Sequence, residues 1–141
     1  MNKDDGLKLL KDVKHINQLI EQLTYQIEEI YSMLTSTTVK PKTMNIQVSK
    51  NSDPLATQMA KVLEYKEKLE TYKSELCAKK TEVLDVLQHM EMQYQSILVM
   101  RYFNLYTIEE IGQRLNRSSY YHTWQLVHRA EEEFCEIYSK K

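Results

Sequence analysis

The sequence predicts an all-α protein in which a long, heptad-bearing helical hairpin or coiled coil precedes a three-helix, helix-turn-helix domain. Two long stretches repeat apolar residues every three or four positions, and the last third of the chain holds shorter amphipathic stretches separated by turn residues. Glycine and proline are scarce, with 2 of each among 141 residues, where average usage gives roughly ten and seven. This scarcity excludes an all-β fold, whose turns need these residues, and a glycine-rich phosphate loop.

The first element is a helix over residues 5–34. Its apolar positions are separated by alternating gaps of four and three residues, which defines a heptad seam. The seam comprises Leu9, Val13, Ile16, Ile20, Leu23, Ile27, Ile30 and Leu34. Flanking apolar residues widen the stripe, namely Leu10, Leu19, Tyr31 and Met33. A stripe of this width favours packing against more than one partner helix.

Residues 35–52 are predicted to be a linker. They contain Lys40, Lys42 and Lys50 but no acidic residue, and the apolar period stops. Pro41 prevents a continuing helix because it lacks the backbone N–H. The basic excess makes this segment a candidate for contact with phosphate, and a solvated loop is the alternative.

A second long helix is predicted from about residue 54 to 92. Asp53 can cap it and Pro54 fits its first turn. Apolar residues recur every seven positions at Leu55, Val62, Leu69, Leu76, Val83 and Met90, with Tyr65, Tyr72 and Val86 between them. Neither long helix can bury its stripe alone. The sequence leaves open an antiparallel hairpin that packs further across a dimer, and a parallel coiled-coil dimer.

The domain boundary is placed at residue 93, between an oligomerisation region at 1–93 and a DNA-binding domain at 94–141. Within the second region, a first helix ends near Asn104. Thr107 and Glu110 have the spacing of a capping box, so a second helix begins at Ile108. Ser119 caps a last helix over 120–138. The inward positions predicted for this helix are Thr123, Leu126, Ala130, Phe134 and Ile137.

The motifs of this region resemble the promoter −35 reader, region four, of bacterial sigma factors. The similarity rests on residues 97–103, on Thr107–Leu115, on Ser119 and on His128–Ala130. The whole chain also resembles small phage and prophage regulators of the ArpU/RinA type. Three features depart from the sigma pattern: Gly112 replaces the usual Ala, the turn lacks glycine and is one residue longer, and Thr123 replaces an apolar β-branched residue.

The resemblance implies a set of DNA contacts on the last helix and the turn before it. The base-reading residues it implies are Tyr120, Tyr121, His122 and Gln125. The phosphate-binding residues it implies are Arg114, Arg117, Ser119 and Arg129. Gln pairs with adenine, Tyr and His contact thymine, and Arg pairs with phosphate. A half-buried surface role for each Tyr, and a solvated one for His122, are the alternatives.

Charge and motif content narrow the function classes further. Residues 94–141 hold six basic and six acidic side chains, so DNA binding depends on their local placement. Glu131–Glu133 is predicted to be a solvated face or a contact for a basic surface of RNA polymerase. No catalytic constellation, metal site or cofactor motif is found, and the two cysteines are too few for a disulfide framework. We expect a cytoplasmic protein of a bacterial host cell, without a membrane span.

The leading hypothesis is a sequence-specific transcriptional regulator of phage or prophage type that binds double-stranded DNA as a homodimer or higher oligomer, with RNA polymerase as a possible further partner. Two alternatives are retained. One is the small terminase subunit of a phage packaging machine, and the other is a helical adaptor or scaffold that does not bind DNA.

Overall fold

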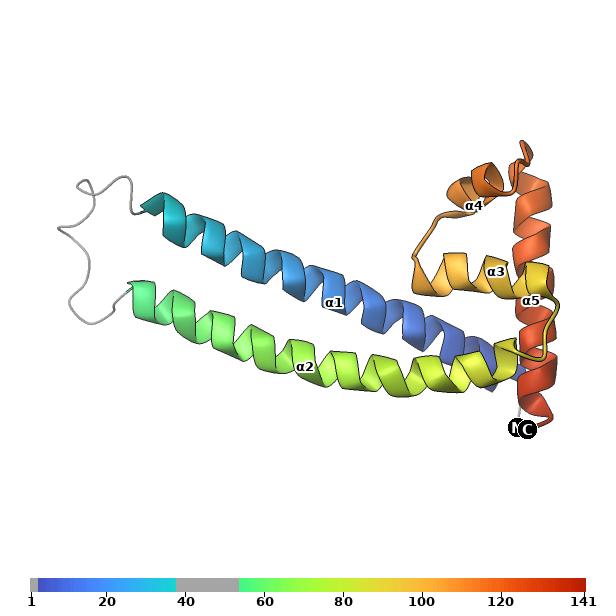
Figure 1. The fold of residues 1–141 in the computed structure, drawn as a ribbon, viewed down its shortest axis with the longest axis horizontal. Coiled ribbons are helices and arrows are strands. Elements are labelled where there is room, and N and C mark those ends of the chain that lie inside the picture. Colours follow the sequence, from blue (N-terminus) through green and yellow to red (C-terminus); the bar gives the residue numbers. More distant parts are fainter. Residues whose placement is uncertain (1–2, 38–53) are drawn as a thin grey trace. The chain divides into compact units, whose positions relative to one another are not determined.

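A computed structural model describes residues 3–37 and 54–141, and these residues form an all-α structure without strands (Figure 1). The elements are α1 (Lys3–Thr37), α2 (Pro54–Leu87), α3 (Met92–Leu98), the π-helical turn η2 (Val99–Phe103), α4 (Ile108–Arg114) and α5 (Tyr120–Ser139). The all-α prediction is confirmed. The linker predicted at 35–52 begins later than expected, because residues 35–37 belong to α1, and the rest of it lies outside the described residues.

The chain divides into two compact units, which we name and describe separately. The hairpin unit is Gln18–Ser74, and the terminal unit combines Met1–Asn17 with Glu75–Lys141. This division differs from the boundary at residue 93. The first turns of α1 and the last turns of α2 belong to the same compact unit as the C-terminal helices, so the long helices contribute to both units.

In the hairpin unit, α1 and α2 lie side by side and run in opposite directions (Figure 1). Ile27, Ile30 and Val62 form a buried cluster, and Leu34, Tyr65 and Leu69 pack against it. At the edge, the ammonium of Lys66 donates a hydrogen bond of 3.2 Å to the hydroxyl of Tyr31 and lies 5.5 Å from its ring centroid. Of the two geometries left open by the sequence, the structure has the antiparallel pairing within one chain.

One heptad position does not follow the predicted seam. Leu55 is 56% exposed, whereas Val62, one heptad later, is 1% exposed. Met59 and Leu63 are also exposed on α2, so three large apolar residues at four-residue spacing line one exposed strip of this helix.

The terminal unit holds most of the buried side chains. Its core joins α1, α2 and the C-terminal helices through Leu10, Val13, Val83, Val86, Ile97, Leu98, Ile111 and Phe134. At Gly6, a Cβ atom would lie 3.1 Å from the Cα of Cys135 on α5, so glycine permits a close approach of α1 and α5. Asn17 donates its amide to the carbonyls of Tyr102 and Phe103, at 3.2 and 3.3 Å.

The predicted second helix is too long at its C-terminal end. α2 ends at Leu87, and the N–H of Met90 bonds the carbonyl of Leu87 at 2.9 Å in a tight turn. Met90 lies beyond the end of α2 but is buried. Its apolar side chain therefore fits the seven-residue period and made the helix look longer than it is. The next helix begins at Met92 and passes into η2, where the N–H of Asn104 bonds the carbonyl of Val99.

The buried face of α5 is rotated slightly from the predicted one. Thr123, Ala130 and Phe134 are buried as expected, but Leu126 and Ile137 are only half-buried. Their expected places are taken by Val127 and Tyr138, and Cys135 is buried as well. The helix α5 packs against α1 in addition to α3 and α4, and this extra neighbour widens its buried stripe.

Candidate nucleic-acid interface

The local structure before α5 is set by two side-chain caps. The Thr107 hydroxyl accepts from the Glu110 N–H at 3.1 Å, and the Glu110 carboxylate accepts from the Thr107 N–H at 2.9 Å. This is the predicted capping box, and it starts α4 at Ile108. The hydrogen bond from the Thr107 N–H favours the ionised carboxylate, and with a side-chain hydrogen bond of Thr107 it holds the pKa of Glu110 below its usual value. At α5, the Ser119 hydroxyl accepts from the His122 N–H at 3.3 Å, as predicted.

The turn between α4 and α5 contains no glycine, the residue that most often adopts the left-handed conformation at the end of a helix. Asn116 has φ of 59°, in the left-handed region that Asn tolerates better than most residues. The Arg117 N–H then bonds the Gly112 carbonyl at 2.8 Å. Asn116 thus reverses the chain at the C-terminal end of α4, which accounts for a turn that lacks glycine.

Gly112 and Thr123 are the points at which α4 and α5 meet. A Cβ atom at Gly112 would lie 2.9 Å from the Thr123 hydroxyl oxygen, so glycine permits the close approach of the two helices. Thr123 is buried, and its hydroxyl donates to the Ser119 carbonyl at 3.1 Å. The polar atom at this apolar position is therefore satisfied within α5.

Tyr121 and Gln125 lie on the exposed side of the first two turns of α5. Tyr121 is 60% exposed and accepts a hydrogen bond of 3.2 Å from the Gln125 amide. The Tyr121 ring stacks on Trp124, with a centroid distance of 6.1 Å, and the Trp124 and His128 rings are 4.0 Å apart. We call Tyr121, Trp124, Gln125 and His128 the aromatic face. Trp124 and His128 complete it, although the sequence interpretation gave them no base-reading role.

Tyr120 and His122 lie differently relative to the aromatic face. His122 is exposed, and its ring centroid lies 6.2 Å from that of Tyr121. Tyr120 is 56% exposed but lines a small cavity together with Gly112 and Arg117, toward α4. The structure therefore brings three of the four implied base-reading residues together and leaves Tyr120 beside the turn.

The implied phosphate contacts are distributed around α4 and α5. Arg114, Arg117 and Arg129 are exposed. The Arg114 guanidinium lies 4.6 Å from the centroid of the Tyr106 ring, a cation–π distance that restricts its orientation. Ser119 is half-buried and its hydroxyl is engaged in the cap of α5.

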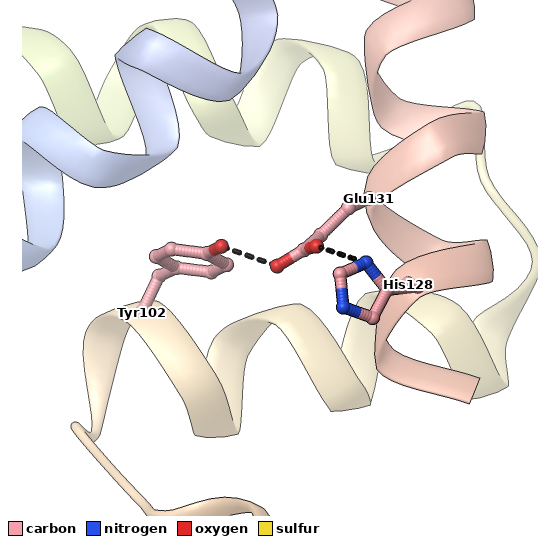
Figure 2. Close-up of polar contacts among 3 residues, drawn as sticks. All are labelled: Tyr102, His128 and Glu131. Carbon is pink, nitrogen blue, oxygen red and sulfur yellow. Dashed lines mark hydrogen bonds and ion pairs between the residues drawn. The ribbon is translucent and has the colours of Figure 1, made fainter. Parts of the chain in front are cut away.

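The acidic run on α5 is only partly the solvated face that we expected. Glu132 is exposed, but Glu131 is half-buried and turns toward η2 (Figure 2). The Tyr102 hydroxyl donates to one of its carboxylate oxygens, and His128 Nδ1 lies 3.3 Å from the other. Burial, and then the hydrogen bond and negative charge of Glu131, raise the pKa of Tyr102 well above its usual value.

Comparisons with protein-family models, curated proteins and solved structures give no match to this chain. None of the helices within residues 3–37 and 54–141 combines the length and apolar composition that crossing a membrane requires. The same part of the chain contains no group of three His, Cys, Asp or Glu side chains arranged to hold a metal ion.

Proposed function

We propose that the protein is a sequence-specific DNA-binding transcriptional regulator that inserts α5 into the major groove. The observation that carries this proposal is the aromatic face, which exposes ring and amide groups on the first turns of a capped helix. A short capped helix and a tight turn precede it, as in helix-turn-helix proteins. The resemblance to sigma region four and to ArpU/RinA-type regulators supports a bacterial, phage-derived regulator that acts beside RNA polymerase in the cytoplasm.

The amide of Gln125 is suited to bidentate recognition of adenine, and the Tyr121 ring to contact with a thymine methyl group. In the structure the two side chains bond each other, so DNA binding exchanges this hydrogen bond for contacts to bases. Arg129 is exposed one turn further along α5, where a backbone phosphate is the expected partner.

The test is a gel shift of the full chain on the intergenic DNA that flanks its own gene, with random DNA as competitor. Binding is compared at about 50 and 200 mM salt, over which phosphate contacts lose affinity. We expect Tyr121→Ala and Gln125→Ala each to lower the preference for the specific site about ten- to a hundredfold, and Arg129→Ala to weaken specific and random binding alike. Tyr25→Ala is the matched control, because Tyr25 is 59% exposed and lies in the hairpin unit. Equal losses in Tyr25→Ala and Tyr121→Ala would contradict the proposal.

Self-association is the second part of the proposal. The exposed apolar strip formed by Leu55, Met59 and Leu63 supports contact with a second copy, which would place two copies of α5 on successive half-sites. Sedimentation equilibrium should give twice the 16.8 kDa chain mass, and Leu63→Gln should shift the protein toward monomer. A ring of eight or more copies would instead favour the small terminase subunit.

One observation favours the adaptor alternative. Basic and acidic side chains balance in residues 94–141, whereas nonspecific affinity for DNA depends on the number of phosphates neutralised. An adaptor would keep its partner interactions when Gln125 and Arg129 are substituted, so the same variants separate the two classes.

A further inference from the structure

The terminal unit contains a basic site next to the aromatic face, built by helices that are far apart in the sequence. It is a cavity of about 230 Å³ lined by α1, η2, the start of α4 and α5. Lys11 and Lys14 of α1 and Arg101 of η2 line it, together with Trp124, His128 and Glu131 of α5. We call this set the basic cavity.

Three cations line the basic cavity but only one carboxylate does, so positive charge is in excess there. The ion pairs of the described residues include neither the two lysines nor Arg101, whose guanidinium donates instead to the Tyr106 carbonyl at 3.3 Å. The one carboxylate that lines the cavity belongs to Glu131. Its two oxygens are engaged by Tyr102 and His128 (Figure 2).

Lys14 and Arg101 are both half-buried, which makes their proximity costly. Burial and then the charge of Arg101 lower the pKa of Lys14, and Glu131 offsets this only in part. Two partly desolvated like charges are stabilised by an incoming anion, and ammonium and guanidinium groups both bind phosphate oxygens through charge-assisted hydrogen bonds.

Trp124 is shared by the basic cavity and the aromatic face. Its ring lines the cavity, and it also stacks on Tyr121 and contacts His128. A group bound in the cavity therefore lies beside the bases that Tyr121 and Gln125 would read. The DNA backbone borders the major groove, so a phosphate is the group available at that place.

We propose that Lys11, Lys14 and Arg101 bind a backbone phosphate of the DNA whose major groove receives α5. This inference rests on the proposed function. It assigns the first turns of α1, which the sequence interpretation placed in an oligomerisation region, to the DNA-binding surface. Phosphate contacts fix register and orientation without reading sequence, so the cavity sets the position of α5 along the groove.

The experiment compares Lys14→Gln and the double variant Lys11→Gln/Lys14→Gln with Lys8→Gln in the full chain. Lys8 is an exposed lysine of the same helix that does not line the cavity, so it matches the change in charge. We expect Lys14→Gln to weaken specific and random DNA binding equally, about three- to tenfold at 50 mM salt. The slope of log K against log salt should become shallower by about 0.9, whereas Lys8→Gln should retain the wild-type slope. Thermal unfolding of each variant shows that it is folded.

The outcomes separate this inference from the proposed function. If wild-type protein binds its site and Lys14→Gln behaves like Lys8→Gln, the basic cavity is not a phosphate site, although the regulator proposal stands. If Tyr121→Ala abolishes site preference while Lys14→Gln changes only affinity and salt slope, both proposals are supported. If the protein binds no DNA but inorganic phosphate raises the melting temperature of wild type and not of Lys14→Gln, the cavity takes a free anion. That result overturns the assignment to DNA.

Discussion

The two parts of α1 carry the same heptad seam but are buried to different depths. In the terminal unit, Leu9, Val13 and Ile16 are buried, and the flanking Leu10 is fully buried as well. In the hairpin unit, Ile20 and Leu23 are only half-buried, although Ile27 and Ile30 are covered. The period of the seam determines which side of the helix faces inward. The number of neighbouring helices determines how much of that side is buried from solvent.

Cores of different depth should respond differently to truncation. Phe134→Ala removes a fully buried ring that stacks on Tyr138 at 6.1 Å, so we expect a loss of about 3–5 kcal/mol in the free energy of unfolding. Ile27→Ala in the two-helix core should cost about 2 kcal/mol, the lower end for such a change. Urea unfolding of the full chain followed by circular dichroism measures both.

Leu84→Ala serves as the control for this pair, because Leu84 is 50% exposed on α2 in the terminal unit. It should change stability by less than about 0.5 kcal/mol. Equal losses for Phe134→Ala and Ile27→Ala would show that depth of burial does not distinguish the two cores.

Features that depend on local sequence were predicted well. Every seam residue of α1 is buried or half-buried, and the caps at Thr107 and Ser119 are both present. A cap needs only residues within one turn of helix, and a seam needs only a regular period, so both can be read from a short stretch of sequence.

Features that depend on tertiary contacts were missed. The end of α2 at Leu87 has no glycine or proline to mark it, and the buried Met90 continues the apolar period. In the sequence, Lys11 and Lys14 resemble the solvent-exposed lysines of any long helix. Only the fold brings them to Arg101 and α5, and no local pattern signals that approach.

Both glycines of the chain lie in the terminal unit, at close approaches of helices, and Gly112→Ala tests the second. A methyl group there would lie 2.9 Å from the Thr123 hydroxyl oxygen, which is fixed by its bond to Ser119. Overpacking should exceed the gain of roughly 1 kcal/mol from better helix propensity, giving a net loss of about 1–2 kcal/mol in thermal or urea unfolding.

A double-mutant cycle provides the control for this substitution. Thr123→Ala removes the obstructing oxygen, so Gly112→Ala should be neutral or stabilising in that background. An identical loss in both backgrounds would contradict a steric origin. Whether alanine is tolerated at position 112 therefore depends on the side chain at position 123.

Tyr102→Phe tests the polar contact that joins η2 to α5 in the terminal unit. Losing its hydrogen bond to Glu131 should cost about 1–2 kcal/mol, measured by urea unfolding at pH 7. The folded-state pKa of Tyr102 is raised above its ordinary value near 10. The neutral hydroxyl therefore stabilises the fold fully below pH 10, and this contribution is lost as the pH rises above 10.

Wild-type protein should consequently lose stability between about pH 10 and 11 more steeply than Tyr102→Phe. Tyr138, whose pKa is raised by burial and by Glu82, titrates in the same direction and remains in both proteins. Tyr72→Phe is the matched control, because it removes a phenol hydroxyl from the hairpin unit and leaves the contact between Tyr102 and Glu131 intact. A pH dependence in Tyr102→Phe as steep as that of wild type would contradict the buried contact.

The smallest effect is expected from the capping box, which acts within one turn of α4 and does not depend on how many helices surround it. Hydrogen bonds with Thr107 lower the folded-state pKa of Glu110. Its ionised form therefore stabilises the fold above the unfolded pKa near 4.5, and that contribution disappears as the pH falls through the folded-state pKa.

Melting temperatures of wild type and Glu110→Gln should differ slightly at pH 7 and converge toward pH 3. The control is Glu109→Gln, in the same turn but outside the box, which should show no such convergence. A constant difference across this range would mean that the cap acts through the shape of the side chain and not through its charge, because glutamine retains an acceptor oxygen but does not titrate.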